Sequence, residues 1–285
     1  MTASLSISEL SDSGTLHQLR WRDGKVAWRM WGNGPAVVLL HGGFGSWTHW
    51  IRTIPALAEE RCVIVPDMPG FGDSDDFSME DAGEEIAEAL LDGLARLVDI
   101  DNGIDVVGFS FGTVIAGTLA AKLAASAPGA LRSLVLTAPA GLGIPSRNFA
   151  GLRSSSPDMS VDETRDMHRH NLGVVMIADP SRITEETIDL QISNTTKKRR
   201  SGKPYSRTGR LLEYCPDLPL KRVHIILGEQ DSYVQQNQPE YGRALEKLHP
   251  ALRIHRIQDG GHWVQYECPR VFNEILTNCL EETGI

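Results

Sequence analysis

The most regular feature of the chain is a series of short runs of four to six residues that are rich in apolar side chains. Runs of this length are too short for a buried helix, and they are typical of strands whose two faces are both covered. We therefore predict buried strands at residues 36–40, 62–65, 104–107, 134–137, 223–227 and 252–257.

The segment that precedes these runs predicts a hairpin. Residues 16–22 and 25–31 flank Asp23-Gly24. An Asp-Gly pair readily adopts the positive φ angles that a two-residue turn requires. We expect the two flanking segments to pair as antiparallel strands.

Amphipathic helices are predicted between the runs. Ile86, Leu90 and Leu94 recur at helical spacing, and Ser78 with Asp81 resembles a capping box at the start of that helix. Further helices are predicted at residues 113–127, 162–176, 184–193, 239–248 and 270–280. The alternation of strands and helices indicates an α/β fold, with a largely parallel sheet covered by helices on both faces.

One segment, residues 142–215, interrupts this alternation and is dominated by Arg, Ser, Asp and Thr. It predicts an insertion between two strands, with residues 1–141 and 216–285 forming the core domain. Within it, residues 197–210, called the basic segment below, hold seven cations and no acid. Two interpretations stay open: a solvated or mobile linker, or a surface that attracts an anionic substrate.

Composition excludes several classes of protein. The chain has 285 residues, 41% of them hydrophobic, and 28 basic against 37 acidic side chains give a net charge of −9. This is an ordinary globular composition, and its acidity argues against a nucleic-acid partner. No stretch approaches the roughly 20 apolar residues that cross a bilayer, and residues 1–14 lack an apolar export signal. With four scattered cysteines, we expect a cytoplasmic protein without a membrane partner.

Residues 108–112, with the sequence Gly-Phe-Ser-Phe-Gly, are the strongest candidate for catalytic chemistry. They follow the predicted strand 104–107 and open a predicted helix. In this setting a G-x-S-x-G sequence places its serine on a sharp, exposed turn, and the glycines leave room for the backbone. The helix N-terminus favours negative charge that develops beside it. Ser110 is the predicted nucleophile.

A serine hydroxyl needs a base, and the base needs a group that orients it. Asp231 follows the predicted strand 223–227, and His262 follows the strand 252–257. Open α/β sheets place their ligand sites at the carboxyl ends of parallel strands, so we expect both side chains to lie near Ser110. Glu229 and Asp259 stay open as alternatives to Asp231.

Acyl transfer also requires backbone donors for an oxyanion. Phe111 directly follows the nucleophile, and the glycine-rich loop after strand 36–40 can supply a second N–H, from Gly43 or, failing that, from Phe44. A dinucleotide-binding turn is excluded because Gly43-Phe44-Gly45 lacks the third glycine of G-x-G-x-x-G. We expect no cofactor.

A metal site is not expected either. Asp166, His168 and His170 are close in sequence, but two histidines two residues apart on a helix point to different faces. No further residues complete a ligand set around them.

Taken together, these motifs resemble the α/β-hydrolase superfamily. The resemblance covers nearly all of the chain after residue 14, and five segments carry it: residues 41–44, 67–74, 108–112, 228–231 and 261–263. It implies an α/β-hydrolase fold with an eight-stranded, mostly parallel sheet and helices on both faces. It also implies that residues 142–215 form a helical cap that roofs the active site and excludes water.

Residues 139–143 and 261–267 are further similar to the carbon–carbon bond hydrolases that cut aromatic meta-cleavage products. That resemblance implies a cap arginine that holds an anionic dienoate. Three arginines of the insertion are candidates: Arg165, Arg169 and Arg182. We take Arg169, together with Phe109 and Trp263, to contact the substrate.

Three functions stay open. The residues favour a serine hydrolase that cleaves a carboxylic ester or related acyl bond of a small molecule through an acyl-enzyme on Ser110. A carbon–carbon bond hydrolase shares the triad but requires the cap to hold a carboxylate. A receptor on the same scaffold would bind a small ligand without turnover. In all three cases the predicted partner is a small molecule, and whether it is anionic stays open. The sequence also leaves open whether the chain forms a homodimer.

Overall fold

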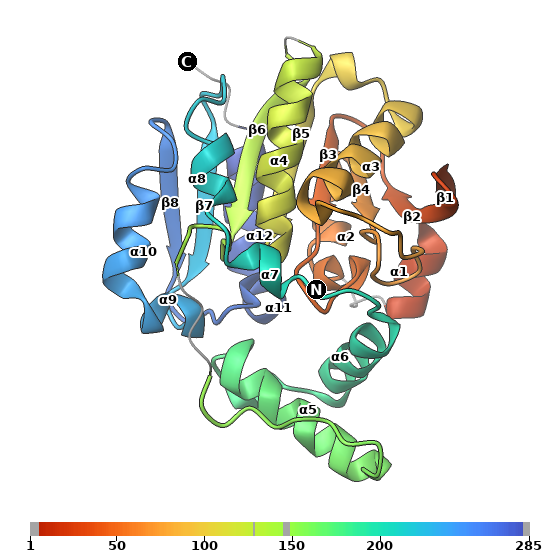
Figure 1. Ribbon diagram of the computed structural model, residues 1–285, viewed down its shortest axis with the longest axis vertical. Helices are drawn as coiled ribbons and strands as arrows, with labels where there is room; N and C mark the ends of the chain where they lie inside the picture. Colours follow the sequence, from red (N-terminus) through yellow and green to blue (C-terminus); the bar gives the residue numbers. More distant parts are fainter. Residues whose placement is uncertain (1–5, 128, 145–148, 282–285) are drawn as a thin grey trace.

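The computed structural model describes residues 6–127, 129–144 and 149–281, and an eight-stranded sheet forms its centre (Figure 1). The strands are β1 Thr15–Trp21, β2 Gly24–Trp31, β3 Ala36–Leu40, β4 Cys62–Pro66, β5 Ile104–Phe109, β6 Leu131–Thr137, β7 Val223–Gly228 and β8 Leu252–Ile257. They lie in the order β1-β2-β4-β3-β5-β6-β7-β8. The β1–β2 and β2–β4 pairs are antiparallel and the others parallel. The predicted hairpin and the mostly parallel sheet are confirmed.

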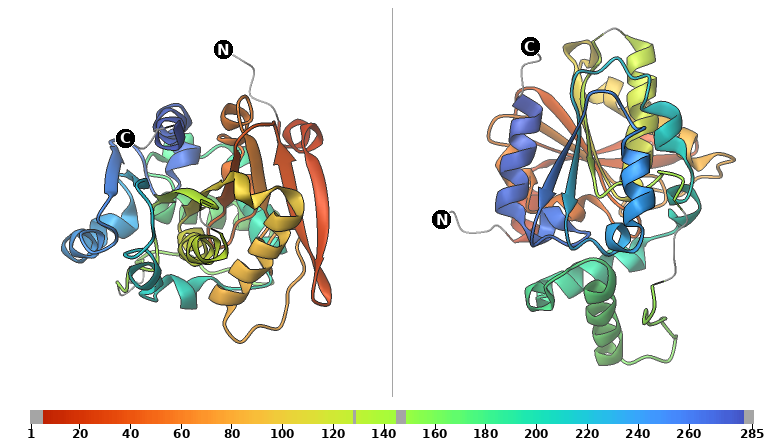
Figure 2. Two further views of the ribbon diagram at one scale, coloured as in Figure 1. Left: turned by 90° about the horizontal axis from the view of Figure 1, so that it is seen from above. Right: turned by 90° about the vertical axis from the view of Figure 1, so that its left-hand side faces the viewer.

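Helices cover both faces of the sheet (Figure 2). The α-helices are α1 Ile7–Ser13, α2 Ile54–Leu57, α3 Ala82–Leu97, α4 Phe111–Ser126, α5 Val161–Val175, α6 Glu185–Lys197, α7 Lys203–Ser206, α8 Arg210–Tyr214, α9 Ser232–Gln236, α10 Gln238–Leu245, α11 Val264–Glu267 and α12 Pro269–Glu281. Short 3-10 helices occur at Trp47–Trp50, Ile100–Asn102 and Pro180–Arg182. Among the described residues no helix is both long enough and apolar enough to cross a membrane.

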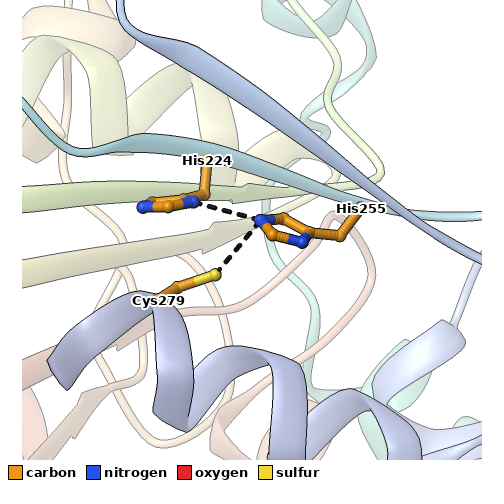
Figure 3. A group of neighbouring side chains, drawn as sticks. All are labelled: His224, His255 and Cys279. Atoms are coloured by element: carbon orange, nitrogen blue, oxygen red, sulfur yellow. Dashed lines mark hydrogen bonds between the residues drawn. The ribbon is translucent and has the colours of Figure 1, made fainter. Parts of the chain in front are cut away.

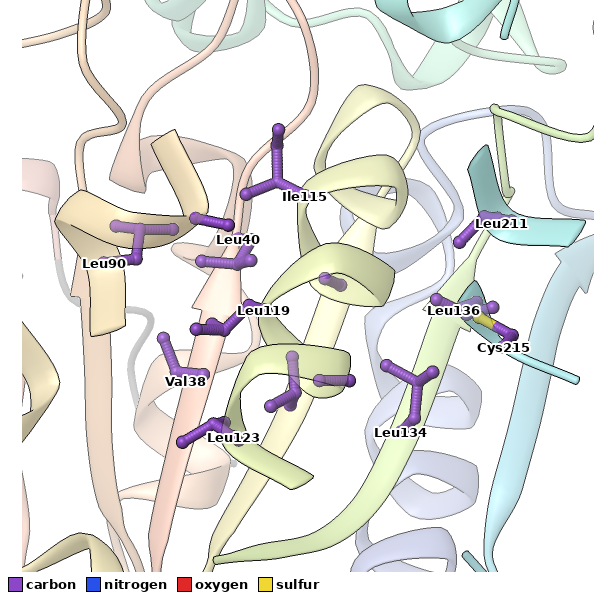
Figure 4. Packing of buried hydrophobic residues seen from close by; sticks show 14 of the residues in the cluster. Val38, Leu40, Leu90, Ile115, Leu119, Leu123, Leu134, Leu136, Leu211 and Cys215 are labelled. Atoms are coloured by element: carbon purple, nitrogen blue, oxygen red, sulfur yellow. The ribbon is translucent and has the colours of Figure 1, made fainter. Parts of the chain in front are cut away.

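Two apolar clusters, one on each face of the sheet, explain the apolar runs. In β3, Val38 and Leu40 belong to the cluster beneath α3 and α4 (Figure 4), whereas Val37 and Leu39 belong to the cluster beneath α2 and α12. Both faces of the strand are therefore covered, as such runs predict. The strand β8 is different: it lies at the edge of the sheet, and Ile254 is 41% exposed.

The predicted cap of α3 is wrong in one detail. Asp81 is the residue that caps this helix, because its carboxylate accepts hydrogen bonds from the backbone N–H groups of Gly83 and Glu84. Ser78 lies three residues before this cap and makes no capping bond. An aspartate accepts two of the unpaired N–H groups of the first turn and also favours the positive end of the helix dipole.

The insertion between β6 and β7 contains α5 to α8, and no strand occurs among its described residues. Figure 1 shows α5 and α6 as a separate lobe beyond the carboxyl ends of the strands. The helix α8 packs instead on the core helix α4, with Leu211 buried against Gly117. A Cβ at position 117 would lie 2.7 Å from Cδ2 of Leu211, so a larger residue there would displace this side chain.

The basic segment is tied to the core by ion pairs, so its interpretation as a mobile linker is wrong. Lys197 lies 2.7 Å from Asp73, and Arg200 lies 2.9 Å from Asp76. Arg210 pairs with the two carboxylates at the start of α3. The acids come from residues 73–84, more than 100 positions earlier in the chain, and local charge patterning cannot reveal pairs of this kind.

A buried charge cluster lies at the opposite end of the parallel strands from the insertion. Asp105 of β5 is 1% exposed and accepts hydrogen bonds from Arg61 at 2.9 Å, Arg132 at 2.8 Å and Ser133 at 2.6 Å. Arg61 is itself buried, so its guanidinium depends on this carboxylate for charge compensation.

We predict that Asp105→Asn lowers the free energy of unfolding by about 3 kcal/mol, because it leaves the buried guanidinium of Arg61 without a counter-charge. Urea denaturation measures this loss. The matched control is Asp92→Asn, which removes a surface carboxylate paired with Arg96 and should cost less than about 0.5 kcal/mol. Equal losses in the two variants would contradict the argument.

Candidate active site

Ser110 stands at a strained turn between β5 and α4. Its backbone has φ 50° and ψ −118°, a conformation that costs an L-residue roughly 1–3 kcal/mol. The turn is held on both sides: the N–H of Ser110 donates to the carbonyl of Thr137, and the carbonyl of Ser110 accepts from Thr113. The strain therefore directs the hydroxyl outward at the carboxyl end of the sheet, as the motif predicts.

The two glycines of the motif allow the surrounding backbone to approach. A Cβ on Gly108 would lie 2.6 Å from the carbonyl oxygen of Gly112, and one on Gly112 would lie 2.5 Å from that of His41. Contacts this short would force the backbone to shift. The glycines thus let helix α4 and the loop after β3 pack directly against the nucleophile turn.

The three predicted triad residues lie within hydrogen-bond distance. The Oγ of Ser110 is 2.9 Å from Nε2 of His262, and Nδ1 of His262 is 2.8 Å from Oδ2 of Asp231. Asp231 is 1% exposed and His262 5% exposed, so both are shielded from water. The two alternative acids, Glu229 and Asp259, have exposed side chains. Of the three candidate acids, Asp231 is therefore the one that is buried and bonded to the imidazole.

Backbone contacts between two loops hold Asp231 and His262 in register. The N–H of Gln230 donates to the carbonyl of Gly260, and a Cβ on Gly228 would lie 2.1 Å from that same oxygen. The loop after β7 therefore packs directly on the loop after β8, which carries His262. Asp231 also caps α9, since its Oδ1 accepts from the N–H of Tyr233 while Oδ2 faces the imidazole.

The predicted oxyanion donors face each other across the turn. Phe111 is the first residue of α4, so its N–H has no partner within the helix. A Cβ on Gly43 would lie 3.6 Å from the Cβ of Phe111, which places the two backbones side by side. Phe44 has φ 61° and also borders the cavity. This arrangement agrees with Gly43 and Phe111 as the two donors.

Two buried histidines hold the two peptide groups of Gly42, the residue before Gly43. The Nδ1 of His41 lies 2.8 Å from the carbonyl oxygen of Gly42, and the N–H of Gly42 donates to Nδ1 of His49 at 3.1 Å. Burial lowers the pKa of His49 well below its ordinary value of 6.5, so Nδ1 stays an acceptor. Because a peptide is planar and trans, fixing the Gly42 carbonyl also fixes the direction of the Gly43 N–H.

Sequence reasoning missed His49, and it also missed Glu267. This buried carboxylate accepts hydrogen bonds from the N–H groups of Gly261 at 2.7 Å, Ala178 at 3.1 Å and Asp179 at 2.9 Å. It thereby joins the loop that carries His262 to the segment that follows α5. His49 lies outside the motifs, and Glu267 is the last residue of the segment 261–267, whose sequence does not show what this carboxylate contacts.

A cavity of about 370 Å³ opens in front of Ser110. Its walls come from the core and from the insertion, and they are mostly apolar. The apolar side chains include Phe109, Phe111, Leu142, Ile144, Phe149, Leu152, Leu172, Val175 and Met176. Outside the triad, polar side chains are contributed by another set: His49, His168, Asn171, Gln191, Thr195, Ser206, Arg207, Tyr233, Asn237 and Tyr241. This composition is typical of a small-molecule site.

Two of the three predicted substrate contacts need correction. Phe109 borders the cavity, but Trp263 is fully buried beside it, stacked on Tyr266 with its indole N–H donating to the carbonyl of His49. Arg169 lies on the outer side of α5 and pairs with Glu185 at 2.5 Å. The sequence of α5 contains too few apolar residues to reveal which side of the helix faces the core.

The other two candidate arginines also lie away from the cavity. Arg165 pairs with Glu185 and Asp189, and Arg182 donates to the carbonyl of Glu267 at 3.2 Å. Among the described residues, Arg207 is the one arginine or lysine that borders the cavity. It lies in the basic segment, just after α7.

The comparison with protein families agrees with this geometry. Residues 37–275 match the alpha/beta hydrolase family. The chain belongs to this family. The 2-hydroxy-6-oxo-6-phenylhexa-2,4-dienoate hydrolase of Burkholderia cepacia is 27% identical to this alpha/beta hydrolase over 266 residues, which cover 87% of the chain and 88% of the relative.

Two solved structures share the fold of this alpha/beta hydrolase. Naproxen esterase from Bacillus subtilis aligns with a TM-score of 0.75 at 18% identity, over 97% of this chain and 99% of the esterase. The meta-cleavage product hydrolase from Pseudomonas fluorescens IP01 aligns with a TM-score of 0.70 at 22% identity, over 93% and 97% of the two chains. At these identities the likeness shows the fold alone.

We predict that His49→Leu lowers kcat for ester hydrolysis roughly 10- to 100-fold with a smaller change in KM, because it frees the N–H of Gly42 in the oxyanion loop while leucine keeps an apolar side chain in the cavity wall. Steady-state kinetics with p-nitrophenyl acetate measures both constants. His49→Asn, whose side-chain oxygen can replace Nδ1 as acceptor, should recover most of the rate. Equal activity of both variants would show that His49 does not position the oxyanion loop.

Proposed function

We propose that this alpha/beta hydrolase cleaves carboxylic esters or related acyl bonds of small molecules through an acyl-enzyme on Ser110. The observation that carries the proposal is the continuous hydrogen-bonded chain from Ser110 Oγ through His262 to Asp231, at 2.9 and 2.8 Å. This order of groups lets an imidazole remove the serine proton while a carboxylate fixes its tautomer.

Each residue of the site then has a defined role in the reaction. His262 takes the proton of Ser110 as the hydroxyl attacks the acyl carbon, and the N–H groups of Gly43 and Phe111 stabilise the oxygen that becomes negative. The protonated imidazole, stabilised by Asp231, gives its proton to the leaving group as the first bond breaks. Water then attacks the acyl carbon with His262 again as base, and the protonated imidazole returns the proton to Ser110 Oγ as the bond to the serine breaks and the acid is released.

The cavity favours an apolar acyl or leaving group. Aromatic side chains pack against the imidazole of His262 beside Ser110. The ring centroid of Phe109 lies 5.2 Å from that of His262, and the ring centroid of Tyr233 lies 4.6 Å from it. Burial raises the pKa of Tyr233 to about 12, so its phenol stays neutral in the working range. Apolar walls of this kind exclude water and strengthen the hydrogen bonds of the triad and the oxyanion donors.

A second candidate is hydrolysis of a carbon–carbon bond in a 2-hydroxy-6-oxo-dienoate, and two observations favour it. The first is the name of the Burkholderia cepacia relative, which acts on such a compound. The second is Arg207, which borders the cavity and whose guanidinium pairs with no carboxylate among the described residues. An arginine without a carboxylate partner of its own is suited to a carboxylate on the substrate.

We predict that Ser110→Ala and His262→Ala each lower kcat by roughly 10⁴-fold or more, and that the double variant is little worse than either one. The reason is that the two residues act as one unit in the same step. Hydrolysis of p-nitrophenyl acetate measures the rates, and a fluorophosphonate probe should label the wild type at Ser110. Losses that multiply would contradict the argument that the two residues act as one unit, and a protein that does not label would favour the receptor alternative.

The carbon–carbon alternative predicts that Arg207→Gln lowers kcat/KM for 2-hydroxy-6-oxo-6-phenylhexa-2,4-dienoate about ten-fold, the loss of one charge-assisted hydrogen bond. Hydrolysis of neutral p-nitrophenyl acetate should stay unchanged. Arg169→Gln is the matched control, because it removes an arginine of the same insertion that faces away from the cavity. A wild type that turns over the ester but not the dienoate would remove this candidate.

A further inference from the structure

Three potential metal ligands meet on the face of the sheet that α12 covers (Figure 3). They are His224 of β7, His255 of β8 and Cys279 of α12. The Nε2 of His255 lies 3.1 Å from Nδ1 of His224 and 3.5 Å from Sγ of Cys279, and all three donor atoms lie within 4.8 Å of one another. None of the three borders the active-site cavity.

These separations are close to those of ligands around one tetrahedral metal ion. With Zn–N bonds of about 2.0–2.1 Å and Zn–S bonds of about 2.3 Å, two nitrogens lie about 3.3 Å apart and a nitrogen and a sulfur about 3.6 Å apart. The measured 3.1 and 3.5 Å differ from these values by a few tenths of an ångström. Small side-chain rotations can supply that difference.

The chemistry of the donors selects a narrow class of metal. Two imidazoles and one thiolate are borderline-soft ligands, which suit Zn²⁺ and exclude the hard cations Mg²⁺ and Ca²⁺. His224 and Cys279 are buried, whereas His255 is half-buried on the edge strand β8. An ion can therefore enter from the edge of the sheet, and water can complete the fourth position of a tetrahedral site.

The site lies away from the triad along the same strands. His224 precedes Gly228, the last residue of β7, by four residues, or about 13 Å at the rise of a strand. Asp231 and His262 both follow the carboxyl ends of their strands. The cluster therefore has no part in the proposed acyl transfer, and a metal there would join β7, β8 and α12.

We propose that His224, His255 and Cys279 form a zinc site that braces the β7–β8 edge of the sheet against α12. The thiol of Cys279 loses its proton on binding, so the ion and the three side chains carry a net charge of +1. One cation beside the site is Arg222. Its guanidinium donates a hydrogen bond to the carbonyl of Leu280 at 3.1 Å. The exposed Arg253 of β8 is the other nearby cation.

Cobalt serves as the probe because Co²⁺ occupies zinc sites and reports its ligands. Metal-free protein titrated with Co²⁺ should develop a thiolate-to-cobalt charge-transfer band that saturates at one equivalent, and one equivalent of Zn²⁺ should abolish the band. Zn²⁺ should also raise the Tm in a concentration-dependent way. Cys279→Ala should remove the band altogether, and His255→Gln should weaken Co²⁺ binding at least about ten-fold.

Cys215→Ala and His17→Gln are the matched controls. Cys215 is a buried thiol beneath α8, and His17 lies on β1 at the far edge of the sheet, so both variants should keep the band. Absence of the band in the wild type, or a band that survives in Cys279→Ala, would overturn the proposal and leave the cluster as a hydrogen-bonded contact. Circular dichroism of each metal-free variant checks that it has folded.

Discussion

Direct packing of backbone on backbone at the carboxyl end of the sheet is the constraint on which the active site depends. At Gly108, Gly112 and Gly228 a Cβ would lie 2.6 Å or less from a backbone oxygen of the neighbouring segment. These contacts bring the nucleophile turn, the oxyanion loop and the loops of Asp231 and His262 close enough for side chains to bond directly. The strain at Ser110 persists because helix α4 and strand β6 hold the backbone on either side.

Much of this arrangement could be predicted from the sequence, because its signals are local. The apolar runs indicate strands, and a chain that alternates strands with helices places its loops at one edge of a parallel sheet. Ser110, Asp231 and His262 each follow such a run directly, so order and position along the chain sufficed to select them. The sequence did not discard Glu229 and Asp259. They could be set aside only from the structure, in which their side chains are exposed.

Other residues could not be predicted, for physical reasons that differ. Arg169 was misplaced because a weakly amphipathic helix does not show which side packs on the core. The ion pairs of the basic segment could not be predicted because its counter-charges come from residues 73–84, far away in sequence. His224, His255 and Cys279 lie on three separate elements, so they form no short sequence motif from which a metal site could be predicted. Contacts that depend on tertiary packing produce no periodic pattern in the amino-acid sequence.

Glu267 shows how such packing couples the insertion to the chemistry. One buried carboxylate accepts from Gly261, beside His262, and from Ala178 and Asp179, beyond α5. The carbonyl of Met176 in turn accepts from the N–H of Trp263, on the other side of His262. Residues 176–179 therefore cannot leave the core without releasing the backbone on both sides of the catalytic imidazole. An opening that preserves the triad must take place elsewhere in the insertion, where α5 and α6 form a lobe of their own.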